Sequence, residues 1–184
     1  MNISVAINPA YMPYLNKPQF MQIFYGGSSS GKSFFICQKI ILDNLDGCNW
    51  LVCRNVARTI RKSVYNEICK AISRMGLREY FKVNASDMVI TNLLNGKQIL
   101  FAGLDDPEKV KSITPADGVL ERVFVEEATE VKREAILQLK KRLRGRSPKS
   151  KHILLAFNPI LKTHFIYKDY FGGWQDDKNV YEGN

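Results

Sequence analysis

The chain has 184 residues, 45% of them apolar, which is enough to bury the core of one domain, and we expect a single domain over residues 1–184. Its 27 basic and 18 acidic side chains leave a net charge of +9, which suits a polyanionic partner but equally suits an ordinary solvated surface. Apolar runs of about eighteen residues and a basic-then-apolar leader are both missing from the sequence, so composition argues against membrane insertion and export, and we expect a cytosolic protein.

The cysteines and histidines do not form a recognisable metal site. The cysteine spacing is not that of zinc-ligand pairs, and only His152 and His164 could add imidazole ligands. We therefore expect reduced structural thiols at Cys37, Cys48, Cys53 and Cys69.

Apolar runs alternate with helical patterns in the first half of the chain. Met21–Tyr25 and Trp50–Cys53 predict two strands, and Lys32–Leu45, which is apolar almost all round, predicts a helix between them. From Arg58 to Met75 the apolar residues recur at a helical period, which predicts a long amphipathic helix with a basic outer face.

The second half begins with a hairpin signal. The short apolar runs Met88–Thr91 and Gln98–Ala102 flank Asn95-Gly96, a strong turn signal, so we expect an antiparallel pair there. The polar segment Asp105–Gly118 that follows predicts a long loop.

Strand and helix patterns resume after this loop. We predict a buried strand at Val123–Val125, a helix from about Lys132 to Arg144, a strand at Ile153–Phe157 and a helix at Thr163–Phe171. The order of elements predicts an α/β fold, a three-layer sandwich with a mainly parallel central sheet, crossover helices and an added antiparallel hairpin.

The segment between the first strand and the first helix matches the phosphate-binding consensus G-x-x-x-x-G-K-[ST]. Small residues let successive backbone N–H groups turn toward the β- and γ-phosphates of a nucleotide, and the helix N-terminus adds partial positive charge. We expect Lys32 to bridge those phosphates and Ser33 to ligate Mg²⁺. A flexible loop without a ligand is the alternative, but the strand-loop-helix context favours a P-loop. The loop consists of Gly26, Gly27, Ser28, Ser29, Ser30, Gly31, Lys32 and Ser33.

Two adjacent glutamates follow the buried strand Val123–Val125. In a P-loop fold Glu126 would hold Mg²⁺ through its water shell, and Glu127 would polarise the attacking water as general base. The alternative is a pair of acids that complements the dipole of the next helix. Asn158 ends the following strand, where its side chain would lie between the two strands that carry these motifs, near the γ-phosphate.

The motifs resemble, in order and spacing, terminase large subunits of the type found in Bacillus-like phages and prophages. The resemblance covers most of the chain, from roughly Tyr11 onward. The matching stretches are YGGSSSGKS at Tyr25–Ser33, GLDDPEKVKSI at Gly103–Ile113, FVEEATEV at Phe124–Val131, LKKRLRG ending at Gly145, and AFNPILKTHFIYKDYF at Ala156–Phe171.

This resemblance implies a P-loop ATPase that uses ATP and Mg²⁺, docks at the portal protein of an empty capsid and pumps double-stranded DNA inward. A small terminase subunit would select the genome, in the host bacterial cytoplasm. It further implies a homo-oligomeric ring on the procapsid and a monomer when alone. Family members carry a nuclease domain after the ATPase domain, and we expect residues 1–184 to lack it and to show no nuclease activity. Asn158 matches the coupling motif that links hydrolysis to movement.

Many relatives have an arginine where this chain has Ser28, so we expect the cation that stabilises the transition state to come from elsewhere. At least one candidate is expected to act across a subunit interface of the ring. The candidates are Arg54, Lys109, Lys111, Arg142, Arg144 and Arg146.

Adenine contacts are only loosely indicated. Gln19, Tyr11 and Phe20 precede the P-loop, where such proteins often hold the base, but each residue could equally be core or surface. The alternatives to a packaging ATPase are a nucleoside or nucleotide kinase with a basic lid at Arg142–Arg146, another P-loop ATPase that translocates DNA, and a non-catalytic DNA-binding module. The adjacent glutamates favour water activation over a kinase.

Overall fold

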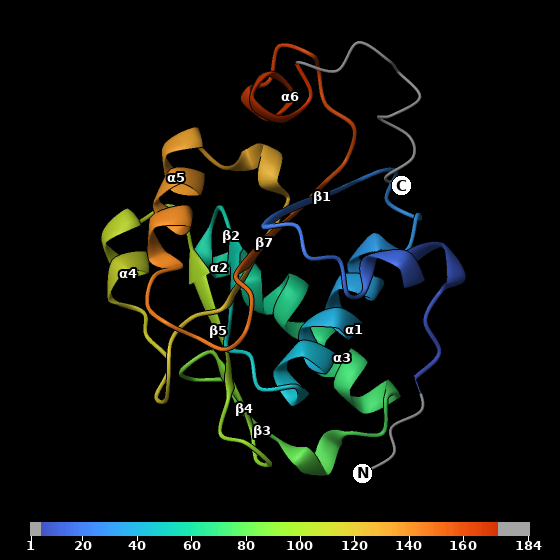
Figure 1. The fold of residues 1–184 in the computed structure, drawn as a ribbon, viewed down its shortest axis with the longest axis vertical. Helices are drawn as coiled ribbons and strands as arrows, with labels where there is room; N and C mark the ends of the chain where they lie inside the picture. The colour runs from blue at the N-terminus through green and yellow to red at the C-terminus, as the bar shows by residue number, and fades with distance from the viewer. Residues whose placement is uncertain (1–4, 173–184) are drawn as a thin grey trace.

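A central sheet of seven strands organises the computed structural model, which describes residues 5–172 without the side chains of residues 107–109 (Figure 1). The strand order is β1-β7-β6-β2-β5-β4-β3, and the first five strands run parallel. β4 and β3 continue the sheet as an antiparallel addition. The predicted fold class is therefore confirmed. The strands are β1 Met21–Tyr25, β2 Trp50–Arg54, β3 Phe81–Asn84, β4 Val89–Asn92, β5 Gln98–Gly103, β6 Arg122–Glu126 and β7 His152–Phe157.

Helices cover both faces of this sheet. In Figure 1, α1 and α3 lie on one side, and α4 and α5 lie on the other. The sheet with its two helical layers forms the expected sandwich. The helices are η1 Pro9–Tyr14, α1 Lys32–Leu45, α2 Ala57–Ile60, η2 Arg61–Tyr65, α3 Asn66–Arg74, η3 Arg78–Tyr80, α4 Pro107–Ser112, η4 Ala128–Glu130, α5 Arg133–Arg142 and α6 Phe165–Tyr170.

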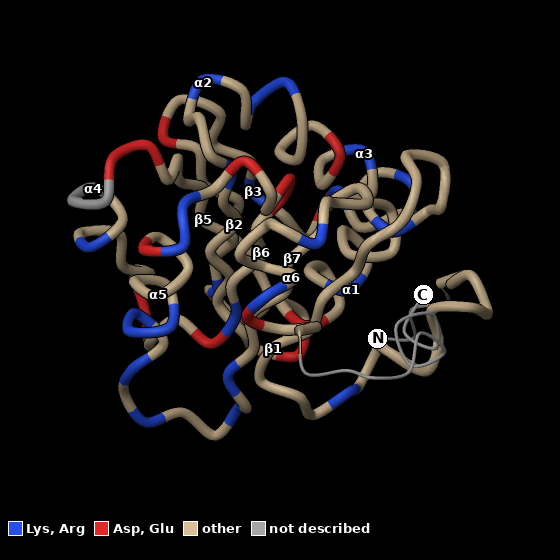
Figure 2. The backbone as a smooth tube through the Cα atoms, turned by 90° about the horizontal axis from the view of Figure 1, so that it is seen from above, with Lys and Arg blue, Asp and Glu red and all other residues tan. Residues whose placement is uncertain are grey.

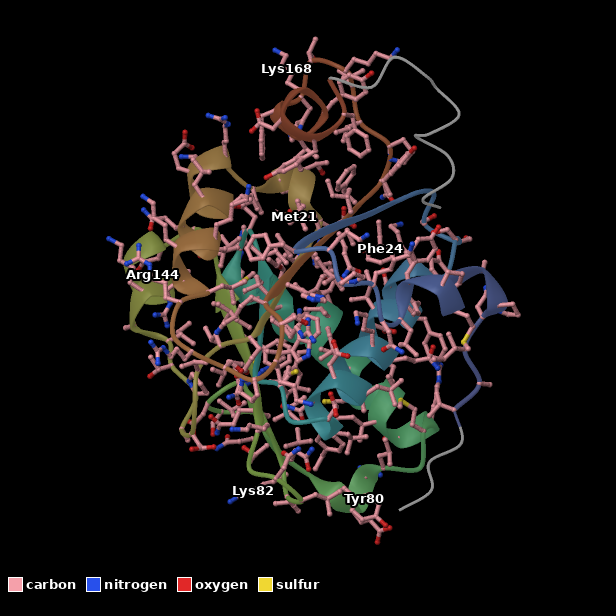
Figure 3. The ribbon with its side chains drawn as sticks, in the orientation of Figure 1. Met21, Phe24, Tyr80, Lys82, Arg144 and Lys168 are labelled. Atoms are coloured by element: carbon pink, nitrogen blue, oxygen red, sulfur yellow. The ribbon has the colours of Figure 1, made fainter. Side chains whose placement is uncertain are left out.

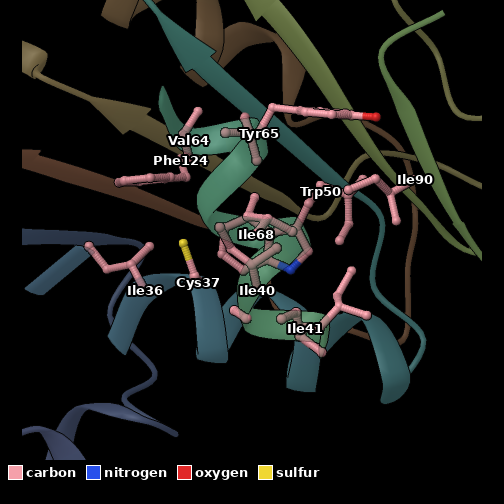
Figure 4. Close-up of a cluster of buried hydrophobic side chains, with 14 of the residues drawn as sticks. Ile36, Cys37, Ile40, Ile41, Trp50, Val64, Tyr65, Ile68, Ile90 and Phe124 are labelled. Atoms are coloured by element: carbon pink, nitrogen blue, oxygen red, sulfur yellow. The ribbon is translucent and has the colours of Figure 1, made fainter. Parts of the chain in front are cut away.

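Alternation along the buried strands creates two separate cores. Trp50 and Val52 face the layer of α1 and α3, whereas Leu51 and Cys53 face the layer of α4 and α5, because successive strand side chains point to opposite faces. Figure 4 shows the first core, where Trp50 lies between helix side chains and β4. Central strands buried on both faces are the reason that these segments read as continuous apolar runs in the sequence.

The long helix predicted from Arg58 to Met75 is divided into three parts. α2 gives way to a π-helical turn, η2, before α3 resumes the ordinary period. Ser63 within that turn has φ −111° and ψ −112°, far from helical values. Ile60, Val64, Ile68 and Ile72 are all buried across this kink, so the apolar spacing of the sequence continues through it and hides the break.

Several short elements differ from the sequence-based expectation. α4 lies within the segment predicted as a loop, and β3, η1, η3 and η4 were not predicted. β4 begins at Val89 because Met88 has φ 54°, a left-handed conformation that a strand does not use. All of these missed elements have six residues or fewer and carry little periodic signal.

A buried polar network lies at the amino ends of β6 and β7. His152 is 3% exposed and pairs in the sheet with Arg122, whose Nε lies 3.6 Å from an Asp43 oxygen. Lys39, 1% exposed, also contacts Asp43, with 3.2 Å between Nζ and Oδ2. Two cations thus share one carboxylate beside a buried imidazole, and Gln22 Nε2 lies 3.2 Å from His152 Nδ1.

Basic and acidic residues occur in several parts of the fold, as the blue and red segments of the backbone in Figure 2 show. Lys82 on β3, Arg144 after α5 and Lys168 on α6 are exposed in three different regions (Figure 3). The excess of basic residues is therefore spread out. Within residues 5–172, no helix is long and apolar enough to cross a bilayer.

The four cysteines are free, as predicted. Cys37, Cys48 and Cys53 are buried, and Cys69 is half-buried. Among the described residues, no group of three or more His, Cys, Asp or Glu side chains is arranged to hold a metal ion.

Candidate nucleotide-binding site

The candidate site lies at the carboxyl ends of the parallel strands. In open α/β sheets, ligands bind at this edge because the connecting loops and the helix N-termini converge there. β7 lies between β1 and β6. The P-loop after β1, Asn158 after β7 and the two glutamates at the end of β6 therefore meet at one edge, although more than 120 residues separate Lys32 from Asn158.

The P-loop connects β1 to α1 through a compact turn. Ser30 N–H donates to Gly27 O at 3.1 Å, and Gly26 N–H donates to Phe157 O at 3.3 Å, which ties the start of the loop to β7. Gly31 has φ +83°, a left-handed conformation that favours glycine. The serines of the loop are exposed, so the outer face of the turn is open to solvent.

Lys32 is held at the centre of the site. Its Nζ donates to Gly26 O at 2.9 Å, Gly27 O at 3.2 Å and Asn158 Oδ1 at 3.1 Å. Burial lowers the pKa of this ammonium, and the charge of Glu127 acts in the opposite direction. Lys32 is thus a cation surrounded by neutral oxygens, an arrangement in which a phosphate oxygen can replace a carbonyl or amide acceptor.

Glu126 is half-buried, with its side chain 15% exposed. Burial raises the pKa of Glu126, while a hydrogen bond from Ser63 and the charge of Arg54 lower it. Its Oε2 is buried and has no hydrogen-bond donor among the described residues, and Arg54 Nη1 lies 3.9 Å away. A buried carboxylate oxygen without a donor fits a role as acceptor for a magnesium-bound water.

Ser33 stands in the first turn of α1 and is exposed, as a hydroxyl that binds a nucleotide-associated metal must be. The residue types and their positions at the sheet edge are therefore compatible with Mg²⁺ held through Ser33 and Glu126.

Glu127 has an unusual backbone. Its φ of 49° and ψ of 51° place it in the left-handed region, which is uncommon for a residue with a side chain. Such a conformation costs on the order of 1–3 kcal/mol and persists where the surrounding structure determines it. The chain turns away from the direction of β6 at Glu127, so the two adjacent carboxylates have different surroundings. The negative charge of Glu127 acts to raise the pKa of Lys32.

Of the candidate cations, Arg54 lies at the end of β2 beside Glu126, with 3.9 Å between its Nη1 and Glu126 Oε2. Lys111 is exposed on α4, beyond the next strand, β5. Arg142 donates a hydrogen bond to Ile113 O, whereas Arg144 and Arg146 are exposed. The side chain of Lys109 lies outside the described part of the chain.

The residues considered for adenine binding have different surroundings. Gln19 and Phe20 are exposed in the segment before β1. Tyr11 is 7% exposed, and its hydroxyl donates to Ser30 O at 2.9 Å. The ring of Tyr11 stacks on Phe35 of α1, with 4.8 Å between centroids and 11° between planes. Tyr11 is therefore part of the scaffold beneath the P-loop.

Sequence reasoning missed two of these contacts. Ser63, in the π-helical turn, hydrogen-bonds to Glu126, and Tyr11 reaches the P-loop from nineteen residues away. Neither residue belongs to a motif, and the spacing of the sequence contains no signal for either contact.

Comparison with known proteins identifies relatives of the chain. A family model described as "Phage terminase large subunit" matches residues 18–184. The PBSX phage terminase large subunit of Bacillus subtilis (strain 168) is 31% identical over 184 residues, covering 96% of this chain and 41% of that protein. The chain thus spans less than half the length of this relative.

Two solved structures share the fold. A large terminase from a thermophilic bacteriophage, solved in complex with ADP, superimposes with a TM-score of 0.66 at 17% identity, covering 89% of this chain and 40% of that one. The N-terminal domain of the DNA packaging ATPase from bacteriophage phi29 gives a TM-score of 0.66 at 13% identity, covering 90% of this chain and 86% of that one.

Proposed function

Because the chain belongs to the phage terminase large subunit family, we propose that it is the ATPase domain of a packaging motor, which hydrolyses ATP with Mg²⁺ to drive double-stranded viral DNA into a procapsid. The observation that carries this proposal is the contact between Lys32 and Asn158, which joins the P-loop to the strand between the two motif-bearing strands. The relative solved with ADP shares this fold and supports a nucleotide as ligand.

The chain's own residues supply binding and positioning. The P-loop amides and Lys32 would hold the β- and γ-phosphates, with Lys32 exchanging its bonds to loop carbonyls and to Asn158 for bonds to phosphate oxygens. Ser33 and Glu126 would hold Mg²⁺, which when bound neutralises phosphate charge. Glu127 would accept a proton from the attacking water as general base.

Asn158 would sense the nucleotide through its contact with Lys32. Its Oδ1 accepts from Lys32 Nζ at 3.1 Å, so a phosphate that draws this ammonium away also releases the amide. A change at the γ-phosphate would thereby reach the segment that leads from β7 into α6. This path from the phosphate through Lys32 and Asn158 is the proposed coupling between hydrolysis and movement.

Several residues are candidates for the cation that stabilises the transition state. Arg54 already faces Glu126 in the same chain, and its proximity to the site supports a catalytic role. Lys111 is exposed on α4 and so is accessible to a neighbouring subunit in a ring. The proposed partners are double-stranded DNA, a portal protein, a small terminase subunit and further copies of the chain, in the host bacterial cytoplasm.

A single assay series tests the proposal. ATPase activity is measured with and without double-stranded DNA over a wide range of protein concentration, with Lys32→Ala as the inactive control. We expect hydrolysis that DNA stimulates and a specific activity that rises with concentration, because a cation supplied in trans requires assembly. Hydrolysis equal to that of Lys32→Ala under every condition would refute the ATPase assignment.

A further inference from the structure

The 3₁₀ segment η1 lies against the P-loop. Three hydrogen bonds fix the chain on either side of Tyr11: Gln38 Nε2 donates to Ala6 O, Lys39 Nζ donates to Leu15 O at 2.5 Å, and Gln22 Nε2 donates to Lys17 O. The donors belong to α1 and β1, the two elements that the P-loop joins. The segment that carries Tyr11 is thus hydrogen-bonded to both β1 and α1, the elements that flank the P-loop.

Tyr11 makes two kinds of contact with that framework. Its ring stacks on Phe35, which in turn packs against Phe24 of β1 with 5.7 Å between centroids. Its hydroxyl donates to the carbonyl of Ser30 at 2.9 Å. The ring also lies 3.7 Å from the position that a Cβ on Gly31 would take, so it packs directly beneath the last turn of the loop. Figure 3 labels Phe24, the β1 residue of this aromatic group.

The hydroxyl contact fixes the direction of one peptide group. In a trans peptide the C=O and the N–H point in opposite directions. Because Ser30 C=O points to the Tyr11 hydroxyl, Gly31 N–H points away from η1, to the side of the loop opposite Tyr11. This amide immediately precedes Lys32, and backbone amides of this kind are the groups that hold phosphate in a P-loop.

The loop itself does not determine this direction. Gly31 adopts φ +83°, and glycine populates both signs of φ with similar ease, so the Ser30–Gly31 peptide can rotate at low cost. Without an outside contact, the amide would divide its time between orientations, and each nucleotide that binds would have to select one of them. The cost of that selection appears as weaker binding.

We infer that Tyr11 is a positioning residue for phosphate binding, whose hydroxyl holds the Ser30–Gly31 peptide with its amide directed at the nucleotide phosphates. The inference rests on the proposed nucleotide site and assigns to Tyr11 a role other than contact with the base. A buried, stacked ring is a stiff support for this purpose, because Phe35 packs against its plane and the hydroxyl donates to Ser30 O.

Tyr11→Phe tests the inference, because it removes the hydroxyl and keeps the stacked ring. The matched control is Tyr65→Phe, the same chemical change at Tyr65 (Figure 4), which is 4% exposed and packs edge-on against Phe101. Dissociation constants are measured by calorimetry for two probes, MgADP and magnesium pyrophosphate, which lacks base and sugar. Melting temperatures are recorded for all three proteins.

We expect Tyr11→Phe to weaken both probes by the same factor, about tenfold, the equivalent of one net hydrogen bond at the upper end of its usual range. Tyr65→Phe should leave both affinities within about twofold of the wild type. Loss of ADP affinity alone would assign Tyr11 to the base and overturn the inference. So would unchanged affinity for both probes, with or without a lower melting temperature, since the hydroxyl would then be only structural.

The wild-type chain separates this inference from the proposed function. If it bound neither probe, the nucleotide site itself would be wrong. If it bound MgADP but not magnesium pyrophosphate, the site would stand, but the loop would not hold phosphate independently and the role assigned to Tyr11 would fall.

Discussion

Stability should decline in mild acid because of one buried histidine, and the size of the effect follows from its surroundings. Burial, together with the positive charges of Arg122 and Lys39, lowers the pKa of His152 to about 4. A histidine in an unfolded chain titrates near about 6.5. Between these two values the unfolded chain binds a proton that the folded chain does not, so the free energy of unfolding decreases as pH falls through this window.

A single group with these two pKa values loses about 2 kcal/mol of unfolding free energy between pH 7 and pH 5. The assay is urea denaturation followed by far-ultraviolet circular dichroism at both pH values, in the wild type and in His152→Gln. Glutamine does not titrate but retains an amide that can meet Gln22. The wild type should lose about 2 kcal/mol more than the variant, since other titrating groups contribute equally to both proteins. An equal loss in the two proteins would refute the reasoning.

Three further predictions concern the candidate site. Lys32→Ala should abolish MgATP binding and hydrolysis in calorimetry and phosphate-release assays, and unchanged turnover would remove the P-loop from the mechanism. Glu127→Gln should bind MgATP without turnover, because the amide keeps the shape of the carboxylate but cannot act as a base. Glu126→Gln should instead raise the Mg²⁺ concentration required for activity. The opposite pattern would exchange the roles of the two glutamates. Asn158→Asp should weaken MgADP binding by about tenfold or more relative to Asn158→Ala, since a carboxylate at the position 3.1 Å from Lys32 Nζ would compete with phosphate for the ammonium. Equal affinities of those two variants would contradict that competition.

The elements that the sequence predicted well are those in which packing repeats a simple pattern. α1 and β1 were predicted residue for residue, because an apolar strand, a glycine-rich loop and an apolar helix leave few alternatives. β6 and β7 were also predicted within one residue at each end, since strands buried on both faces read as unbroken apolar runs.

The elements that were missed depend on tertiary contacts. β3 is a four-residue edge strand with only Phe81 buried, so its identity comes from pairing with β4. The apolar spacing from Ile60 to Ile72 continues across the kink at Ser63, so the sequence pattern does not reveal the break. In the site, motifs located the P-loop and the glutamates, but the left-handed backbone of Glu127 and the contact of Tyr11 with Ser30 follow from the folded arrangement alone.

The pairing of β1 with β7 at the edge of the sheet affects how the chain folds during translation. β1 and the P-loop are translated before β7, with which β1 pairs, and Gln22 of β1 lies 130 residues before its side-chain contact His152 of β7. Contacts so distant in sequence slow folding, because the chain loses entropy in closing the loop before the contact stabilises it. On the ribosome, the phosphate loop therefore emerges well before the strand that anchors it, and the nascent chain cannot gain stability from a nucleotide until β7 has been made. A stalled nascent chain that ends before His152 should accordingly remain sensitive to protease in the presence of MgADP.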